Sequence, residues 1–128
     1  MFIRFVIEEL DEDSGRRQGL FQAARDLKKS GVLSVSDYDK LEGLRDWFNE
    51  HLKKPDRLAL SSRPHAKAVA LSWFRDTAKD HIVKMREFQS VLERYGLHVK
   101  MIKAKRLGYV LYEDEFQVAA YPFSDTPT

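Results

Sequence analysis

The sequence predicts an α+β fold: a two-layer sandwich with a mixed five-stranded sheet and helices mainly on one of its faces. Three observations predict it. The chain has 128 residues, which suits one domain. Hydrophobic residues make up 43% of it, enough for one core. Short apolar runs alternate with longer segments of helical period, in the order β-α-α-β-α-β-β-β. We place the domain at residues 1–123 and a frayed polar tail at residues 124–128.

The first strand and the first helix are predicted from the N-terminal third of the chain. The apolar run at residues 2–7 has the length of a buried strand, and an acidic run at residues 8–13 follows it. Ser14 stands in the following turn and suits a helix N-cap. Apolar residues then recur at helical spacing over residues 20–27, and Gly31 supplies the end of this helix.

A second helix and a loop come next. The helix is predicted to start after an N-cap at Ser36, and its apolar residues form one stripe over residues 41–52. Pro55 ends it. Residues 53–67 contain two prolines, two serines and five basic residues against one acid, without any period. We interpret this stretch as an exposed basic loop.

The second half of the chain predicts a strand, a long helix and a strand. The strand comes from the apolar run at residues 68–74, and the helix extends from a capping box at Thr77 to Gly96. Alternation then predicts a strand over residues 97–103. A right-handed crossover of this kind should place its two strands parallel in one sheet.

Two last strands are predicted at residues 109–113 and 116–121, joined by a tight hairpin through Asp114. With the strand before them they should form a meander.

Charge is distributed unevenly along the chain. The net charge is +2, but the balance is −3 over residues 1–52, +9 over residues 53–107 and −4 over residues 108–128. Such asymmetry concerns partners rather than the fold. If folding brings the loop at residues 53–67 and the strand and turn at residues 98–106 to one face, they form a surface that attracts phosphate. The predicted binding residues are Lys53, Lys54, Arg57, Arg63, His65, Lys67, Lys100, Lys103, Lys105 and Arg106.

The leading functional hypothesis is a non-catalytic binding or regulatory domain, without a cofactor, that uses this basic surface to meet an acidic partner, either nucleic acid or protein. One alternative is a metal-dependent enzyme that cleaves phosphoesters, with a divalent cation on Glu113, Asp114 and Glu115. A solvated hairpin tip is the simpler interpretation of the same acids. Another alternative is a protein-interaction module of the immunity-protein type, with the acidic run at residues 8–13 or the hairpin as its contact surface.

Several classes of protein are excluded or disfavoured. The chain contains no cysteine, which excludes disulfides and thiolate zinc sites and agrees with a cytoplasmic location. No apolar run approaches the roughly 18 residues of a spanning helix, so no membrane contact is expected. The N-terminus turns acidic where a signal peptide needs a longer apolar core. The four histidines are far apart, and none is paired at the spacing of a helical metal site.

Four segments resemble a group of small uncharacterised bacterial proteins. They are RPHAK at residues 63–67, SWF at residues 72–74, HIVKMREFQSVLERYG at residues 81–96 and GYVLYEDEFQVAAYPF at residues 108–123. The resemblance extends over nearly the whole chain and implies a bacterial, cytosolic protein. It transfers no catalytic or binding residue, since no activity is assigned to that group.

Overall fold

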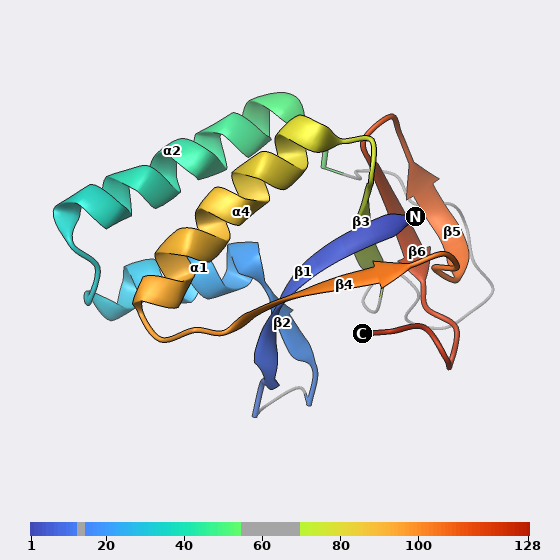
Figure 1. Ribbon diagram of the computed structural model, residues 1–128, viewed down its shortest axis with the longest axis horizontal. Coiled ribbons are helices and arrows are strands. Elements are labelled where there is room, and N and C mark those ends of the chain that lie inside the picture. Colours follow the sequence, from blue (N-terminus) through green and yellow to red (C-terminus); the bar gives the residue numbers. More distant parts are fainter. Residues whose placement is uncertain (13–14, 55–69) are drawn as a thin grey trace.

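Six strands and three helices follow one another in a computed structural model that describes residues 1–12, 15–54 and 70–128 (Figure 1). They are β1 (Phe2–Leu10), β2 (Arg17–Gly19), α1 (Leu20–Ser30), α2 (Val35–His51), β3 (Leu71–Arg75), α4 (Lys79–Arg94), β4 (Val99–Ala104), β5 (Tyr109–Glu113) and β6 (Gln117–Tyr121). The predicted α+β class and the order of elements are confirmed, with β2 as an additional strand. No helix among the described residues is long and apolar enough to cross a bilayer.

The sheet is built around β1. One edge of β1 pairs with β4 from Phe2 to Ile7. The opposite edge is shared, because β3 pairs with its start at Phe2 and Ile3, while β2 pairs with its end between Val6 and Leu10. Beyond β3 come β6 and then β5. The predicted mixed sheet of five strands is therefore corrected to six strands, whose described pairings are all antiparallel.

This shared edge contains a gap that positions the candidate site. Pairing with β3 ends at Ile3 and pairing with β2 begins at Val6, so neither strand supplies a partner for Arg4 or Phe5. Neighbouring residues of a strand point to opposite faces. Phe5 packs into the core on the helix side, and Arg4 belongs to the other face with Val6. The gap thus presents an aromatic ring to one face and a guanidinium to the other.

The strands at the ends of α4 are parallel but are not neighbours. β3 and β4 are both antiparallel to β1, which lies between them. The prediction of two parallel strands in one sheet is confirmed as a split β-α-β unit. The predicted meander is wrong, because β4 pairs with β1 and β6 pairs with β3, and only β5 and β6 form a hairpin. β1 offers β4 a register of six consecutive residues, which outweighs closeness in the sequence.

The helix starts differ from the predicted ones. The N-cap of α2 is Ser34, whose side chain accepts a hydrogen bond from the Asp37 nitrogen at 3.1 Å, rather than Ser36. The N-cap of α4 is Ala78, without a side-chain cap, rather than Thr77. In both helices, the polar residue that the sequence pattern selects as N-cap is not the residue at which the helix begins.

The first helix follows β2 directly. Its N-cap is Gly19, which makes no side-chain cap, and the predicted cap Ser14 lies outside the described residues. The predicted end at Gly31 is confirmed, because this residue has the left-handed φ of 76° that a helix C-cap favours. Gly96 after α4 likewise has a φ of 83°.

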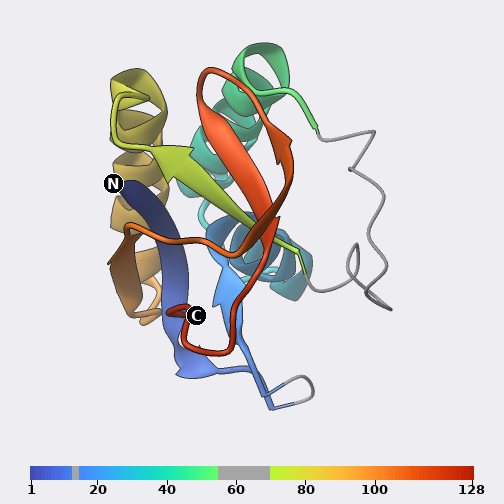
Figure 2. The same cartoon turned by 90° about the vertical axis from the view of Figure 1, so that its right-hand side faces the viewer.

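Two apolar clusters hold the layers together. The larger lies between the sheet and the helices, which gather on one side of the strands (Figures 1 and 2). The smaller lies on the opposite face and includes Val6, Trp73 and Val118. Beyond residue 123, in the stretch predicted to be a frayed tail, Thr126 is buried and its hydroxyl accepts a hydrogen bond from the Phe123 nitrogen at 2.9 Å.

Candidate functional site

A cavity of about 690 Å³ opens at the gap between β2 and β3. Its lining includes residues from both faces of the sheet, and residues of α1, α2 and α4 complete it. Six of the described lining residues carry a positive charge, and none of them carries a carboxylate. The cations are Arg4, Arg25, Lys28, Arg45, Lys53 and Lys54. We refer to this cavity as the cationic pocket.

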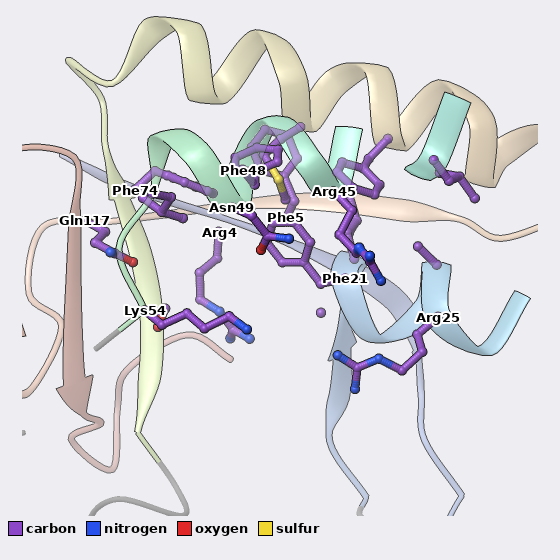
Figure 3. A pocket seen from close by; sticks show the side chains of 18 of the residues that line it. Arg4, Phe5, Phe21, Arg25, Arg45, Phe48, Asn49, Lys54, Phe74 and Gln117 are labelled. Carbon is purple, nitrogen blue, oxygen red and sulfur yellow. The ribbon is translucent and has the colours of Figure 1, made fainter. Parts of the chain in front are cut away.

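Different elements direct these cations to one opening. In Figure 3, Arg4 from β1 and Lys54 from the chain after α2 extend toward one another on one side. Arg25 from α1 and Arg45 from α2 approach from the other side (Figure 3). The residues come from four parts of the chain, so only the tertiary fold gathers their charges.

Some of the cations are neutralised by neighbouring acids. Lys28 forms an ion pair with Glu42, and this hydrogen bond lowers the pKa of the Glu42 carboxyl. Arg45 lies 3.6 Å from the same carboxylate, measured from Nη2 to Oε2. By contrast, within the described part of the chain, no ion pair is formed by Arg4, Arg25, Lys53 or Lys54. The described part of the pocket therefore has a net positive potential.

Arg4 is half-buried, as Lys28 is, but Lys28 forms an ion pair with Glu42 and Arg4 forms none among the described residues. Its guanidinium carbon lies 5.7 Å from the centre of the Trp73 ring. Among the described residues it has no hydrogen-bond partner for its guanidinium, and burial lowers its pKa to about 10. A pKa at that level leaves it charged at neutral pH, so Arg4 is a partly desolvated cation without a counter-ion among the described residues.

Trp73 adds a second unsatisfied donor at the same place. This side chain is 1% exposed and lines the pocket, and its Nε1 is buried without a hydrogen-bond partner in the described structure. Leaving a buried donor unpaired costs about 1–3 kcal/mol. Two adjacent side chains, Arg4 and Trp73, thus both lack an acceptor among the residues that the structure describes.

Aromatic rings form the apolar part of the lining. Phe21 is 38% exposed, and its ring packs edge-on against Phe48 at 5.0 Å and Phe88 at 5.3 Å, measured between ring centres. Phe48 and Phe88 are both buried. A continuous aromatic surface therefore leads from solvent at Phe21 into the pocket.

Gln117 on β6 fixes the chain that carries Lys53 and Lys54. Its side-chain nitrogen donates to the Lys53 carbonyl and, at 3.1 Å, to the carboxylate of Asp114. Gln117 is buried and lines the pocket, so this contact ties the end of α2 to the sheet at the mouth of the cavity.

The predicted basic surface is only partly represented in this pocket. Lys53 and Lys54 line it, but the two lysines of β4 do not. Lys103 is paired with Ile3, whose side chain packs toward the helices, whereas Lys100 is paired with Val6, which packs toward the other face. Lys100 and Lys103 therefore leave β4 on opposite faces.

The remaining predicted binding residues are not gathered with Lys53 and Lys54 either. Lys105 and Arg106 lie in the turn after β4, outside the cationic pocket, where Arg106 stands 4.9 Å from the centre of the Phe123 ring. Four predicted residues lie outside the described ranges: Arg57, Arg63, His65 and Lys67.

The acids of the β5–β6 hairpin have structural contacts. The Asp114 carboxylate accepts hydrogen bonds from the Phe116 nitrogen at 2.8 Å and the Tyr112 hydroxyl at 2.8 Å. Glu113 pairs with Arg75 at 3.1 Å. Within residues 1–12, 15–54 and 70–128, no group of three or more potential metal ligands lies together. The described residues thus offer no support for a cation site on Glu113, Asp114 and Glu115.

The acidic run continues the first strand instead of following it. β1 extends to Leu10, beyond the predicted end at residue 7, and its β1–β2 end projects away from the helices (Figure 1). Glu9 accepts a hydrogen bond from His98 Nδ1 at 2.7 Å, which raises the pKa of His98. Part of the acidic run thus contacts the start of the predicted basic strand region.

Sequence reasoning missed the most informative members of the pocket. Arg4 is a lone charge inside an apolar strand, and that interruption was a signal in the sequence. Arg25 and Arg45 are ordinary charges on helices, and no local pattern separates them from solvent-facing residues.

Comparison with known proteins adds no relative. No protein-family model, curated protein or solved structure matches this chain.

Proposed function

We propose that the protein is a non-catalytic binding domain that takes an anionic group of its partner into the cationic pocket. The observation that carries this proposal is Arg4, a half-buried guanidinium that lines a cavity of about 690 Å³ and has no counter-ion among the described residues. A partly buried charge without a partner is costly, and proteins retain such groups where function uses them.

The size and chemistry of the pocket support binding. Its volume lies within the range of about 300–1,000 Å³ that small-molecule sites occupy, and its lining combines apolar rings with a few polar groups. Its uncompensated cations raise the local concentration of anions by focusing the field into a cleft. Its described lining contains no carboxylate, imidazole or thiol, the groups that most often supply acid–base or nucleophilic chemistry.

The cationic pocket is a better contact surface than the lysines of β4. Lys100 and Lys103 point to opposite faces, so they do not present one patch to a nucleic acid or an acidic protein. A macromolecular partner would bind through an anionic group small enough to enter the pocket.

A thermal-shift experiment with named anions tests this function. Octanoate, adenosine monophosphate and pyrophosphate are each added to the wild type, to the double variant Lys54→Glu/Arg25→Glu and to the double variant Lys100→Glu/Lys103→Glu. We expect at least one anion to raise the Tm of the wild type and of the β4 variant, because ligand binding stabilises the folded state. The same anion should leave the Tm of the pocket variant unchanged.

Two results would contradict the proposal. One is that none of the three anions changes the Tm of the wild type at low salt. The other is that the pocket variant and the β4 variant respond equally, since a general effect of charge would then explain the shift.

A further inference from the structure

Two residues that line the cationic pocket carry hydrogen-bond donors that together suit one kind of head group. Arg4 contributes a planar fork of N–H groups, and the neighbouring Trp73 contributes one indole N–H. Both residues line the cavity, and both lack an acceptor in the described structure. A carboxylate has two oxygens in one plane, so one can accept from the guanidinium and the other from the indole.

Charge balance favours a monoanion over a phosphate at this position. Arg4 is half-buried and, unlike the half-buried Lys28, has no ion pair among the described residues, and burial already lowers its pKa to about 10. One guanidinium neutralises one negative charge, whereas a phosphate dianion would carry a second charge into a partly desolvated space. Lys53, Lys54 and Arg25 are exposed, so they attract anions to the mouth rather than compensate charge inside.

The aromatic lining suits a ligand that has an apolar body in addition to a charged head group. The exposed ring of Phe21 continues into the buried rings of Phe48 and Phe88. A small acid such as acetate would leave the exposed part of the Phe21 ring uncovered, while an apolar body would remove it from water at about 25 cal/mol per Å². The ligand that matches both parts has a charged head and an apolar body.

From these observations we propose that the pocket binds an amphipathic monocarboxylate, with its head group on Arg4 and Trp73 and its apolar body along Phe21, Phe48 and Phe88. This assignment rests on the proposed function and specifies its ligand class. In this assignment, Arg4 binds the carboxylate, and Phe21 packs against the apolar body of the ligand at the entrance.

Isothermal titration calorimetry with three probes tests the assignment. Octanoate has both parts of the ligand, octanol has only the apolar body, and adenosine monophosphate has a phosphate and a flat ring. We expect octanoate to bind most tightly of the three. Arg4→Met should weaken octanoate by about 10- to 100-fold, the value of hydrogen bonds to a charged group. The same substitution should leave the affinity for octanol unchanged.

Matched variants separate head-group recognition from a general change of structure. Arg75→Met alters another half-buried arginine that does not line the pocket, and it should retain the wild-type affinity for octanoate. Arg4→Lys keeps the charge but removes the fork, so its affinity should lie between those of the wild type and Arg4→Met. In the wild type, octanoate should also shift the NMR signal of the Trp73 indole N–H, which would gain an acceptor.

The outcomes distinguish this inference from the proposed function. If adenosine monophosphate binds and octanoate does not, the monocarboxylate assignment is overturned and the anion-binding function stands. If octanoate and octanol bind equally, or Arg4→Met leaves octanoate affinity unchanged, Arg4 does not read the head group and the inference fails. If no anion binds, both proposals fail.

Discussion

Two arginines of the sheet occupy similar positions and have opposite surroundings. Arg4 on β1 and Arg75 on β3 are both half-buried, and each guanidinium stands over an aromatic ring, at 5.7 Å from Trp73 and 5.8 Å from Phe2. Arg75 donates through Nε to the Asp114 carbonyl at 2.9 Å and through Nη2 to Glu113 at 3.1 Å. Arg4 has neither kind of bond among the described residues.

The difference separates a charge that stabilises the fold, that of Arg75, from a charge that is available to bind a ligand, that of Arg4. Arg75 ties β3 to the β5–β6 hairpin, so its hydrogen bonds contribute to stability. Arg4 lies at the gap in the sheet beside a cavity, where its desolvation is not offset by a partner. Removing the Arg75 side chain should therefore lower the stability and leave binding unchanged. Removing the Arg4 side chain should weaken binding and leave the stability nearly unchanged.

The largest effect on stability is expected from Arg75→Met. The variant loses the bond to the Asp114 carbonyl, and we expect the free energy of unfolding to fall by about 1–2 kcal/mol. Urea denaturation followed by circular dichroism measures it. Glu113→Gln is the control, because Glu113 is 60% exposed and an exposed ion pair contributes less than about 1 kcal/mol. Equal losses in the two variants would show that the surface pair, not the carbonyl bond, stabilises the hairpin.

A smaller effect on stability is expected at acid pH. It concerns Asp114, whose carbonyl accepts a hydrogen bond from Arg75. Burial raises the pKa of Asp114, but the hydrogen bonds from Phe116, Tyr112 and Gln117 together lower it by more than burial raises it. The pKa of Asp114 is therefore below its usual value. A lowered pKa contributes stability that is present above the unfolded pKa of about 4 and is lost as pH falls through the folded pKa. Below about pH 4, wild-type stability should therefore fall more steeply than that of Asp114→Asn. Parallel pH profiles of the two proteins would contradict this.

The smallest effect on stability is expected from Arg4→Met. The substitution keeps an unbranched side chain against Trp73 and removes a desolvated charge, so we expect the free energy of unfolding to stay within about 1 kcal/mol of the wild type or to rise. The same urea titration measures it, with Arg75→Met as the comparison. A loss larger than that of Arg75→Met would break the distinction, since Arg4 would then be a structural residue.

Most elements of the fold could be predicted from the sequence because their signals are local. The apolar stripes of α1, α2 and α4 and the short apolar runs of the strands identify them directly. β2 has only three residues, which is too short for a period. The pairing of β4 with β1 joins segments about 95 residues apart, and no local pattern encodes the choice between β1 and β5.

Less of the site could be predicted. Lys53 and Lys54 were found from the charge of their segment, and both line the pocket. The role of Arg4 depends on the gap between β2 and β3, which arises only when both strands share one edge of β1. Arg25 faces the same opening from α1, and its position there is likewise a product of tertiary packing.

The most direct test of the central claim observes the two arginines together. An NMR titration with octanoate follows the Nε–Hε signals of Arg4 and Arg75, assigned by comparing the wild type with Arg4→Met and Arg75→Met. We predict that octanoate shifts the Arg4 signal in a saturable manner and leaves the Arg75 signal in place. Of these two arginines, only Arg4 lines the pocket, and only Arg4 lacks an acceptor among the described residues. An unchanged Arg4 signal at saturating octanoate, or equal shifts of both signals, would contradict the claim that Arg4 binds the head group of a monocarboxylate.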